Sequence, residues 1–260
     1  MKTAAIILNH NLPDYTDMLY ESLKPYERQD YDLFILDNGS SKEGMSKYTS
    51  FKLDENVYFG GGFNAAMQFV LEDPQYDSLL FLNNDLTVHP YNFVKVLREV
   101  MFIQDPMVDE PSISGPDSPY FDVVSATFYN VEPKGQCHWK SMLGYGQRNT
   151  REVPFIDFQC PLLSRRVLQE VGSIDPSLVI GWGIDTYFAI ICKKKGWKMG
   201  VTDRLSMLHH NSLTVKKGVA GLTMEEYCRK AESGQAEFFN KVGLVKEFHE
   251  IRAAGEAYKL

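Results

Sequence analysis

The stretch that decides the fold is Ser78-Leu79-Leu80-Phe81-Leu82-Asn83-Asn84-Asp85. Its apolar run predicts a strand buried on both faces, as in a parallel sheet, and the run stops at three short polar residues. Ligands of open α/β sheets bind just beyond the carboxyl ends of strands, so Asp85 is expected where a ligand sits. Asn83 and Asp85 share one side of an extended chain and offer oxygen ligands to a divalent cation. The alternative is a plain turn that caps the helix begun by Pro90.

Composition narrows the class of protein. The 260 residues are 44% hydrophobic and 23% charged, which is typical of one globular α/β domain with or without a small appendage. A net charge of −7 argues against a nucleic-acid partner. The longest apolar runs are too short to cross a bilayer, and no signal peptide is expected. The 4 cysteines lack paired spacing, so we expect neither a zinc site nor a disulfide framework, and a reducing cytoplasm as the setting.

Strands and helices alternate along the first hundred residues. Strands are predicted at residues 3–8, 33–36, 57–59 and 78–82, and helices at residues 14–23, 63–71 and 91–102. This alternation predicts an α/β fold with a doubly wound, mostly parallel sheet. Polar side chains follow three of the strands, in Asn9-His10-Asn11, Asp37-Asn38 and Asn83-Asn84-Asp85. Strands must end in turn formers, but this excess of acids and amides favours a polar ligand along one edge of the sheet.

The rest of the chain changes character. Residues 105–153 are rich in Pro and Gly and are predicted to form an insertion packed beside the sheet, with short antiparallel strands at 123–129 and 136–142. Its aromatic residues suit either sugar stacking or a structural role: Tyr120, Phe121, Phe128, Tyr129, Trp139 and Tyr145. Further helices are predicted at residues 164–171, 186–195 and 224–242, and a strand at residues 198–201.

Three segments of this second half carry candidate functional residues. Gly181-Trp182-Gly183-Ile184-Asp185 precedes a helix, so Asp185 is either a cap or part of a site where glycines allow close approach and Trp182 stacks on a sugar. His209 and His210 are either surface residues or a ligand source, of which at most one reaches a given metal. Lys216 and Lys217 lie in a solvated loop or in one that closes over an anionic ligand.

Taken in order, these motifs resemble the family 2 glycosyltransferases of the GT-A fold. The resemblance runs from about residue 3 to residue 214, and it depends on the ordered set, since each motif alone is weak. It implies a single GT-A domain over residues 1–222, with a nucleotide-sugar-binding half at 1–104 and an acceptor-binding half at 105–222. Residues 223–260 would form a carboxyl-terminal helical extension.

The resemblance implies an inverting, hexosyltransferase-type enzyme that depends on Mn²⁺ or Mg²⁺. It would move a sugar from a nucleotide-diphosphate sugar, UDP- or dTDP-linked, to a hydroxyl of a carbohydrate, lipid-linked or protein-linked glycan acceptor. Polysaccharide biosynthesis in the cytoplasm is the implied setting. Peripheral association with a membrane and the oligomeric state stay open.

On this resemblance, the nucleotide-sugar-binding residues are Asn9, His10, Asn11, Asp37, Asn38, Asn64, Asn83, Asn84, Lys216 and Lys217. Asp37 would accept a hydrogen bond from the nucleobase, and Asn64 would lie near the ribose and diphosphate. The metal ligands would be Asp85 and His209, with His210 as the alternative. Asp185 would deprotonate the acceptor hydroxyl, beside Trp182 and Gly183 in the acceptor site. This chemistry is physically coherent, because a cation stabilises a leaving diphosphate and a carboxylate activates a hydroxyl.

Two departures from the family pattern leave other functions open. Asn83 replaces the first acid of the Asp-x-Asp motif, and Ile184 replaces the acid that usually precedes the catalytic one. Both changes allow a non-catalytic GT-A-like carbohydrate-binding or assembly subunit. A sugar nucleotidyltransferase is the other alternative, but residues 9–13 lack the glycine-rich cationic loop that would hold a triphosphate.

Overall fold

The computed structural model describes residues 1–27, 30–89, 92–102, 119–128, 139–144, 150–210, 213–218 and 221–258. The strands are β1 (Lys2–Asn9), β2 (Tyr31–Asn38), β3 (Phe51–Leu53), β4 (Tyr76–Asn83), β5 (Leu86–Val88), β6 (Val123–Phe128), β7 (Thr150–Glu152), β8 (Leu162–Ser164) and β9 (Met199–His209). The α-helices are α1 (Pro13–Leu23), α2 (Tyr58–Glu72), α3 (Phe93–Phe102), α4 (Arg165–Val171), α5 (Ile184–Lys195), α6 (Leu213–Lys216), α7 (Met224–Lys241) and α8 (Val245–Glu256). Short 3-10 turns are η1 (Lys24–Tyr26), η2 (Lys140–Met142) and η3 (Pro176–Leu178).

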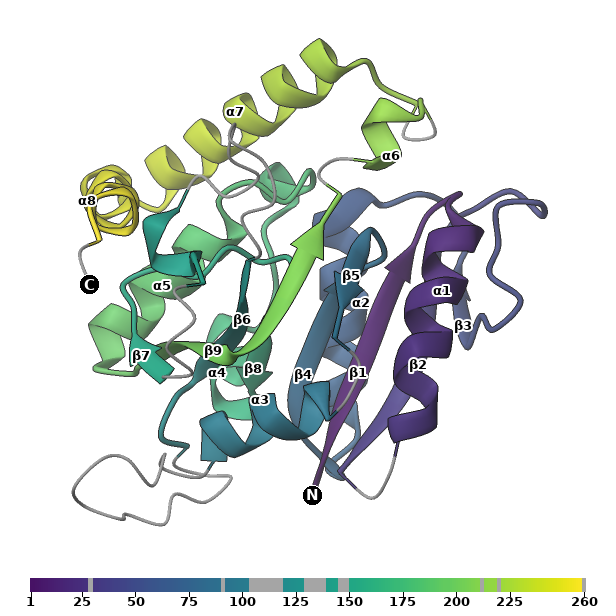
Figure 1. The fold of residues 1–260 in the computed structure, drawn as a ribbon. Coiled ribbons are helices and arrows are strands. Elements are labelled where there is room, and N and C mark those ends of the chain that lie inside the picture. The colour runs from purple at the N-terminus through teal and green to yellow at the C-terminus, as the bar shows by residue number, and fades with distance from the viewer. Residues whose placement is uncertain are drawn as a thin grey trace.

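The described strands form one sheet in the order β3-β2-β1-β4-β8-β6-β9-β5, with β7 paired to β9. Its first part is parallel, with β1 between β2 and β4. Helices α1 and α3 cover one face, and α2 and α4 cover the other (Figure 1). The aliphatic side chains of β1 and β4 are therefore buried on both faces, which explains their unbroken apolar runs. The predicted doubly wound α/β sheet is confirmed.

The structure corrects the prediction for the middle of the chain. Strand β6 lies inside the sheet, antiparallel to β8 and parallel to β9, and not in an insertion beside it. All six of its residues are buried, and a strand buried on both faces has to lie in the sheet interior. The second predicted strand, at 136–142, is also wrong where the chain is described, because Lys140–Met142 forms η2. Residues 136–138, Tyr129 and Tyr145 lie outside the described residues.

The prediction of a third strand at residues 57–59 is wrong as well. The third strand is β3, and α2 begins at Tyr58. Asn56 Oδ1 accepts a hydrogen bond from the Tyr58 amide at 2.8 Å, a turn that starts the helix. The glycines read as a strand end lie inside α2 for close packing, since a Cβ on Gly60 would lie 2.6 Å from the Leu178 carbonyl oxygen.

The carboxyl-terminal helices pack against the sheet domain. Helix α7 confirms the helix predicted at 224–242, while α8 was not predicted as a separate helix. Helix α7 lies against η3 and α8 against α5, and Figure 1 shows α7 spanning the region above the carboxyl end of β9. The contact with η3 is close, because a Cβ on Gly234 would lie 1.9 Å from the Ser177 carbonyl oxygen. In the described part of the chain, no helix combines the length and apolar character needed to cross a membrane.

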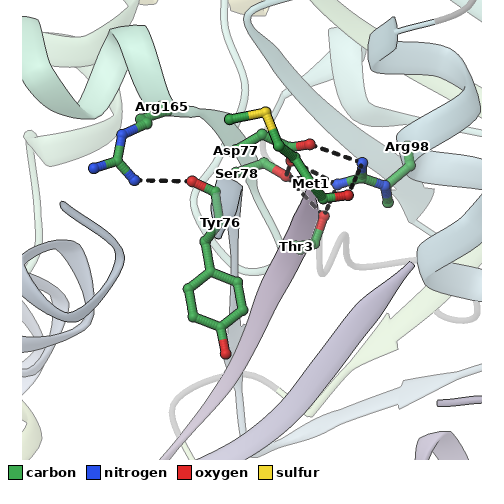
Figure 2. A network of polar contacts seen from close by, with 7 residues as sticks. All are labelled: Met1, Thr3, Tyr76, Asp77, Ser78, Arg98 and Arg165. Carbon is green, nitrogen blue, oxygen red and sulfur yellow. Dashed lines mark hydrogen bonds and ion pairs between the residues drawn. The ribbon is translucent and has the colours of Figure 1, made fainter. Parts of the chain in front are cut away.

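A buried ion pair stabilises the end of the sheet where β1 and β4 begin, opposite the carboxyl ends of these strands. Arg98 of α3 donates to Asp77 Oδ1 at 2.6 Å and Oδ2 at 2.9 Å, and also to the hydroxyls of Thr3 and Ser78 (Figure 2). Arg165 donates to backbone carbonyls at the end of α2 and to that of Tyr76. These contacts attach three helices to the two central strands, so this edge is structural.

We expect Asp77→Ala to lower the free energy of unfolding by about 3–5 kcal/mol, because Arg98 would lose its buried partner. Urea denaturation measures this loss. As a control, Lys193→Ala removes the exposed pair with Glu250 and should cost less than about 1 kcal/mol. Equal losses of unfolding free energy in the two variants would show that the Asp77–Arg98 pair stabilises the fold no more than an exposed ion pair does.

Candidate active site

A cavity of about 600 Å³ opens at the carboxyl ends of the parallel strands. The first half of the chain lines it with Leu8, His10, Asn38, Asn56, Tyr58, Phe59, Asn83, Asn84 and Asp85. The second half contributes Trp139, Asp157, Phe158, Gln159, Ile180, Gly181, Trp182, Gly183, Asp185, His209, Thr214, Val215, Tyr227, Arg252 and Glu256. Strand β8 runs antiparallel to β4, so its amino-terminal end brings residues 157–159 to the same edge. The volume suits a small organic ligand.

Asp85 and His209 form a buried pair in this cavity. Strand β9 runs on to His209, well past the predicted end at residue 201, and pairs with β5 so that His209 lies opposite Leu86. His209 Nε2 is 3.1 Å from Asp85 Oδ1, and the Leu213 amide donates to Asp85 Oδ2 at 3.3 Å. Burial alone would raise the pKa of Asp85, but the hydrogen bond and charge of His209 hold this pKa below its usual value. The Asp85 carboxylate is therefore kept ionised.

The donor set fits a divalent cation. Asn83 Oδ1 and His209 Nδ1 are buried and have no hydrogen-bond partner among the described residues. Together with the Asp85 carboxylate they offer oxygen and imidazole ligands. The described residues hold no cluster of three or more His, Cys, Asp or Glu side chains around one point, so further ligands would come from a bound molecule or water. His210 is not part of the cavity wall, and its Nε2 lies 3.0 Å from the Thr87 hydroxyl.

Of the residues expected at the nucleotide, four line the cavity, while two that were expected at the nucleobase do not. His10, Asn38, Asn83 and Asn84 are in the wall. Asn9 and Asp37 are fully buried outside it, with Asn9 Nδ2 donating to Asp37 Oδ2 at 2.8 Å. Asp37 Oδ1 also accepts from the Ser40 amide at 2.9 Å. This carboxylate therefore holds the turn after β2 together.

Four other candidates also lie outside the cavity wall. The side chain of Asn11 accepts from the Ser41 amide, and that of Asn64 exchanges two hydrogen bonds with the backbone of Ile174. Lys217 Nζ lies 4.5 Å from the centre of the Tyr15 ring, and Lys216 is exposed on α6. Helix α6 replaces part of the loop predicted at 214–222.

Asp185 lies in the first turn of α5 and lines the cavity. Gly183, with a φ of 90°, makes the turn before it, and Trp182 is 39% exposed beside Tyr227. Asp185 Oδ1 accepts from the Thr186 amide at 2.6 Å. Burial, reinforced by the negative charge of Asp157, raises the pKa of Asp185 to about 7, while Arg252 acts in the opposite direction. Near neutral pH this carboxylate can take up a proton, as a general base must.

Sequence reasoning missed the acidic and cationic neighbours of Asp185. Asp157 accepts from Gln159 Nε2 at 3.0 Å, and Gln159 Oε1 is buried without a partner among the described residues. Arg252 of α8 lies 4.5 Å above the Trp139 ring and forms no ion pair with any described residue. Tyr227 and Glu256 come from α7 and α8. Asp157 and Gln159 interrupt the apolar run just before β8, a signal that could have marked this end of the strand, but nothing in the sequence of α8 indicates a cavity.

Comparison with known proteins identifies the fold. No family model matches the chain. Mb1552 of Mycobacterium bovis and Rv1525 of Mycobacterium tuberculosis, both uncharacterised, are each 25% identical to it over 211 residues, 80% of this chain and 74% of theirs.

Among solved structures, GalNAc-T7 with UDP, GalNAc and Mn²⁺ has a TM-score of 0.60 at 14% identity, covering 97% of this chain and 55% of that one. TarS of S. aureus in complex with UDP-GlcNAc has a TM-score of 0.54 at 12% identity, over 97% and 72%. The mannosyltransferase PcManGT of Pyrobaculum calidifontis, in complex with GDP-Man and Mn²⁺, has 0.52 at 11%, over 100% and 76%. The chain therefore has the GT-A fold of these glycosyltransferases.

We expect Asp157→Asn to lower the pKa of Asp185 from about 7, because a neighbouring negative charge is removed. Arg252→Met should raise it, because a positive charge is lost. Carbon-13 NMR titration of the aspartate carboxyl groups measures both shifts, with Asp14→Asn on the exposed side of α1 as control. A pKa that stays unchanged in both variants would show that burial alone sets it.

Proposed function

We propose that this chain is an inverting, metal-dependent glycosyltransferase. The observation that carries the proposal is the single cavity that contains both the Asp85–His209 pair and the Asp185 carboxylate. It lies at the carboxyl ends of β1 and β4, where the sheet order reverses and open α/β sheets bind their ligands. The three solved glycosyltransferases of the same fold hold a nucleotide or nucleotide sugar, two of them with Mn²⁺, which supports the same ligand class here.

Asp85 and His209 would hold Mn²⁺ or Mg²⁺, with Asn83 beside them. Such a cation neutralises the charge that develops on a leaving nucleoside diphosphate. His10, Asn38 and Asn84 would contact the UDP- or dTDP-linked donor. Lys216 and Lys217 lie outside the cavity wall, and reaching the diphosphate would require α6 to move.

Asp185 would take the proton from the acceptor hydroxyl as that oxygen attacks the anomeric carbon of the donor sugar. The carbon–oxygen bond to the diphosphate breaks in the same displacement, and attack from the opposite face inverts the anomeric centre. Trp182 offers a ring surface for the acceptor, a glycan that is free, lipid-linked or protein-linked, whereas Trp139 is buried with Arg252 above its ring. Polysaccharide assembly by a family 2 enzyme in the cytoplasm is the setting we propose, in line with the free thiols of Cys160, Cys192 and Cys228.

Binding of nucleoside diphosphates should depend on Asp85. A ligand at a hundred times its dissociation constant adds about 2.7 kcal/mol, so UDP with Mn²⁺ should raise the melting temperature by several degrees. Asp85→Asn and His209→Ala should lose the part of this shift that needs Mn²⁺. His210→Ala is the matched control and should keep it. A metal-dependent shift that survives in Asp85→Asn would remove Asp85 from the metal site.

Sugar transfer should depend on Asp185. We expect Asp185→Asn to lower turnover by at least about a hundredfold while the affinity for UDP stays unchanged, because the amide cannot accept the proton. In the wild type, kcat/KM should rise with pH through about 7, where Asp185 ionises. Near wild-type turnover in the variant would contradict the role of base. Metal-dependent binding of nucleotide without turnover in the wild type would indicate a non-catalytic binding subunit.

A further inference from the structure

A network of amide and imidazole groups joins the carboxyl ends of β1 and β2 to the start of α2 in the cavity wall. It consists of His10, Asn38 and Asn56, and we call it the amide network. His10 Nδ1 lies 2.8 Å from the Asn38 carbonyl oxygen, and Asn56 Nδ2 lies 3.1 Å from His10 Nε2. Asn38 Nδ2 donates to Asn56 Oδ1 at 3.1 Å. The three side chains therefore fix one another.

The hydrogen-bond partners determine the orientation of each group. A carbonyl oxygen only accepts, so His10 Nδ1 donates to it, and His10 Nε2 accepts from Asn56 at 3.1 Å and lies 3.3 Å from Asn11 Nδ2. The Tyr58 amide only donates, so the Asn56 atom that it contacts at 2.8 Å is the oxygen. The Val57 amide likewise identifies Asn38 Oδ1 at 3.0 Å. None of these assignments depends on a free choice of amide flip.

The network is left with one spare group on Asn56. Both protons of Asn38 Nδ2 are used, one on Asn56 Oδ1 and one on the Tyr58 carbonyl oxygen at 3.0 Å. Asn56 Oδ1 accepts two hydrogen bonds, which fills its usual capacity. One N–H of Asn56 goes to His10, and the other has no partner among the described residues. The network therefore offers a ligand a donor from Asn56 and no acceptor on that amide.

We propose that Asn56 reads the nucleobase of the donor by donating a hydrogen bond to the carbonyl oxygen at C4 of a pyrimidine or C6 of a purine, which selects keto bases over bases with an amino group at that position. This inference rests on the proposed function, since it names the class of nucleotide that the same cavity takes. Uracil, thymine and guanine carry a carbonyl where cytosine and adenine carry an amino group. An amino group facing Asn56 would put two donors together and leave both unsatisfied.

Asn56 would then take the role of base recognition that the family resemblance assigned to Asp37. That carboxylate is fully buried, and its oxygens already accept from Asn9 and Ser40. Tyr58 and Phe59 line the cavity next to the amide network and offer ring surfaces to a planar base.

The test exchanges the spare donor for an acceptor. In Asn56→Asp, one carboxylate oxygen still accepts from Tyr58 and Asn38, and the other takes the place of the amide nitrogen and offers the base an acceptor. Dissociation constants for UDP, CDP, GDP and ADP, each with Mn²⁺, are measured by calorimetry. We expect the wild type to bind UDP over CDP and GDP over ADP by at least about tenfold, and Asn56→Asp to lose or reverse both preferences.

The matched control is Asp37→Asn, which makes the reverse exchange at the buried carboxylate. It should leave the UDP-to-CDP and GDP-to-ADP ratios unchanged, whatever its effect on stability. The inference is overturned if wild type binds CDP as tightly as UDP, a result that needs no folded variant, or if the ratios follow Asp37 and not Asn56. If the protein binds nucleotides without a base preference, this inference is contradicted and the proposed function is not. If no nucleotide binds in a metal-dependent way, both are contradicted.

Discussion

The antiparallel pairing of β5 with β9 is the constraint on which the candidate site depends. Strand β4 ends at Asn83, the chain turns through Asp85, and β5 returns along β9, so that Leu86 lies opposite His209. The His210 amide then donates to the Asp85 carbonyl oxygen at 2.9 Å. Two segments more than a hundred residues apart are thereby locked in register. A slip of one residue would turn His209 away from Asp85 and bring His210 in its place.

The sequence predicted the sheet where strands are buried on both faces, because such strands are continuous apolar runs. The apolar runs of β1, β2 and β4 and their polar ends predicted a parallel sheet with Asp85 at its ligand-binding edge. The three glycines of α2 misled the prediction, because a glycine that allows a close helix contact looks the same in sequence as one that ends a strand. The strand at 123–129 was predicted, but its place inside the sheet was not, because its neighbours β8 and β9 come from distant segments and leave no local pattern.

The candidate site was predictable only in part, for a related reason. Asp85, His209 and Asp185 carry chemistry that their residue types reveal. The different roles of Asp37 and Asn56 depend on which polar groups satisfy one another, and several of these hydrogen bonds join distant positions, such as Asn38 with Asn56. Arg252 reaches the cavity through the packing of α8 on α5, which depends on tertiary structure.

The charge balance of the cavity connects these parts. Among the described residues of its wall, the carboxyl groups of Asp85, Asp157, Asp185 and Glu256 stand against the single guanidinium of Arg252. A diphosphate brought into such a wall would meet like charges at low dielectric, an arrangement that costs several kcal/mol when uncompensated. A divalent cation at Asp85 changes the sign of that interaction, so nucleotide and metal affinity should be strongly coupled. The same acidity keeps the pKa of Asp185 high, because Asp157 resists a second negative charge beside it. On the proposed function, one acidic cavity would tie cation-dependent donor binding to a carboxyl group that exchanges its proton near neutral pH.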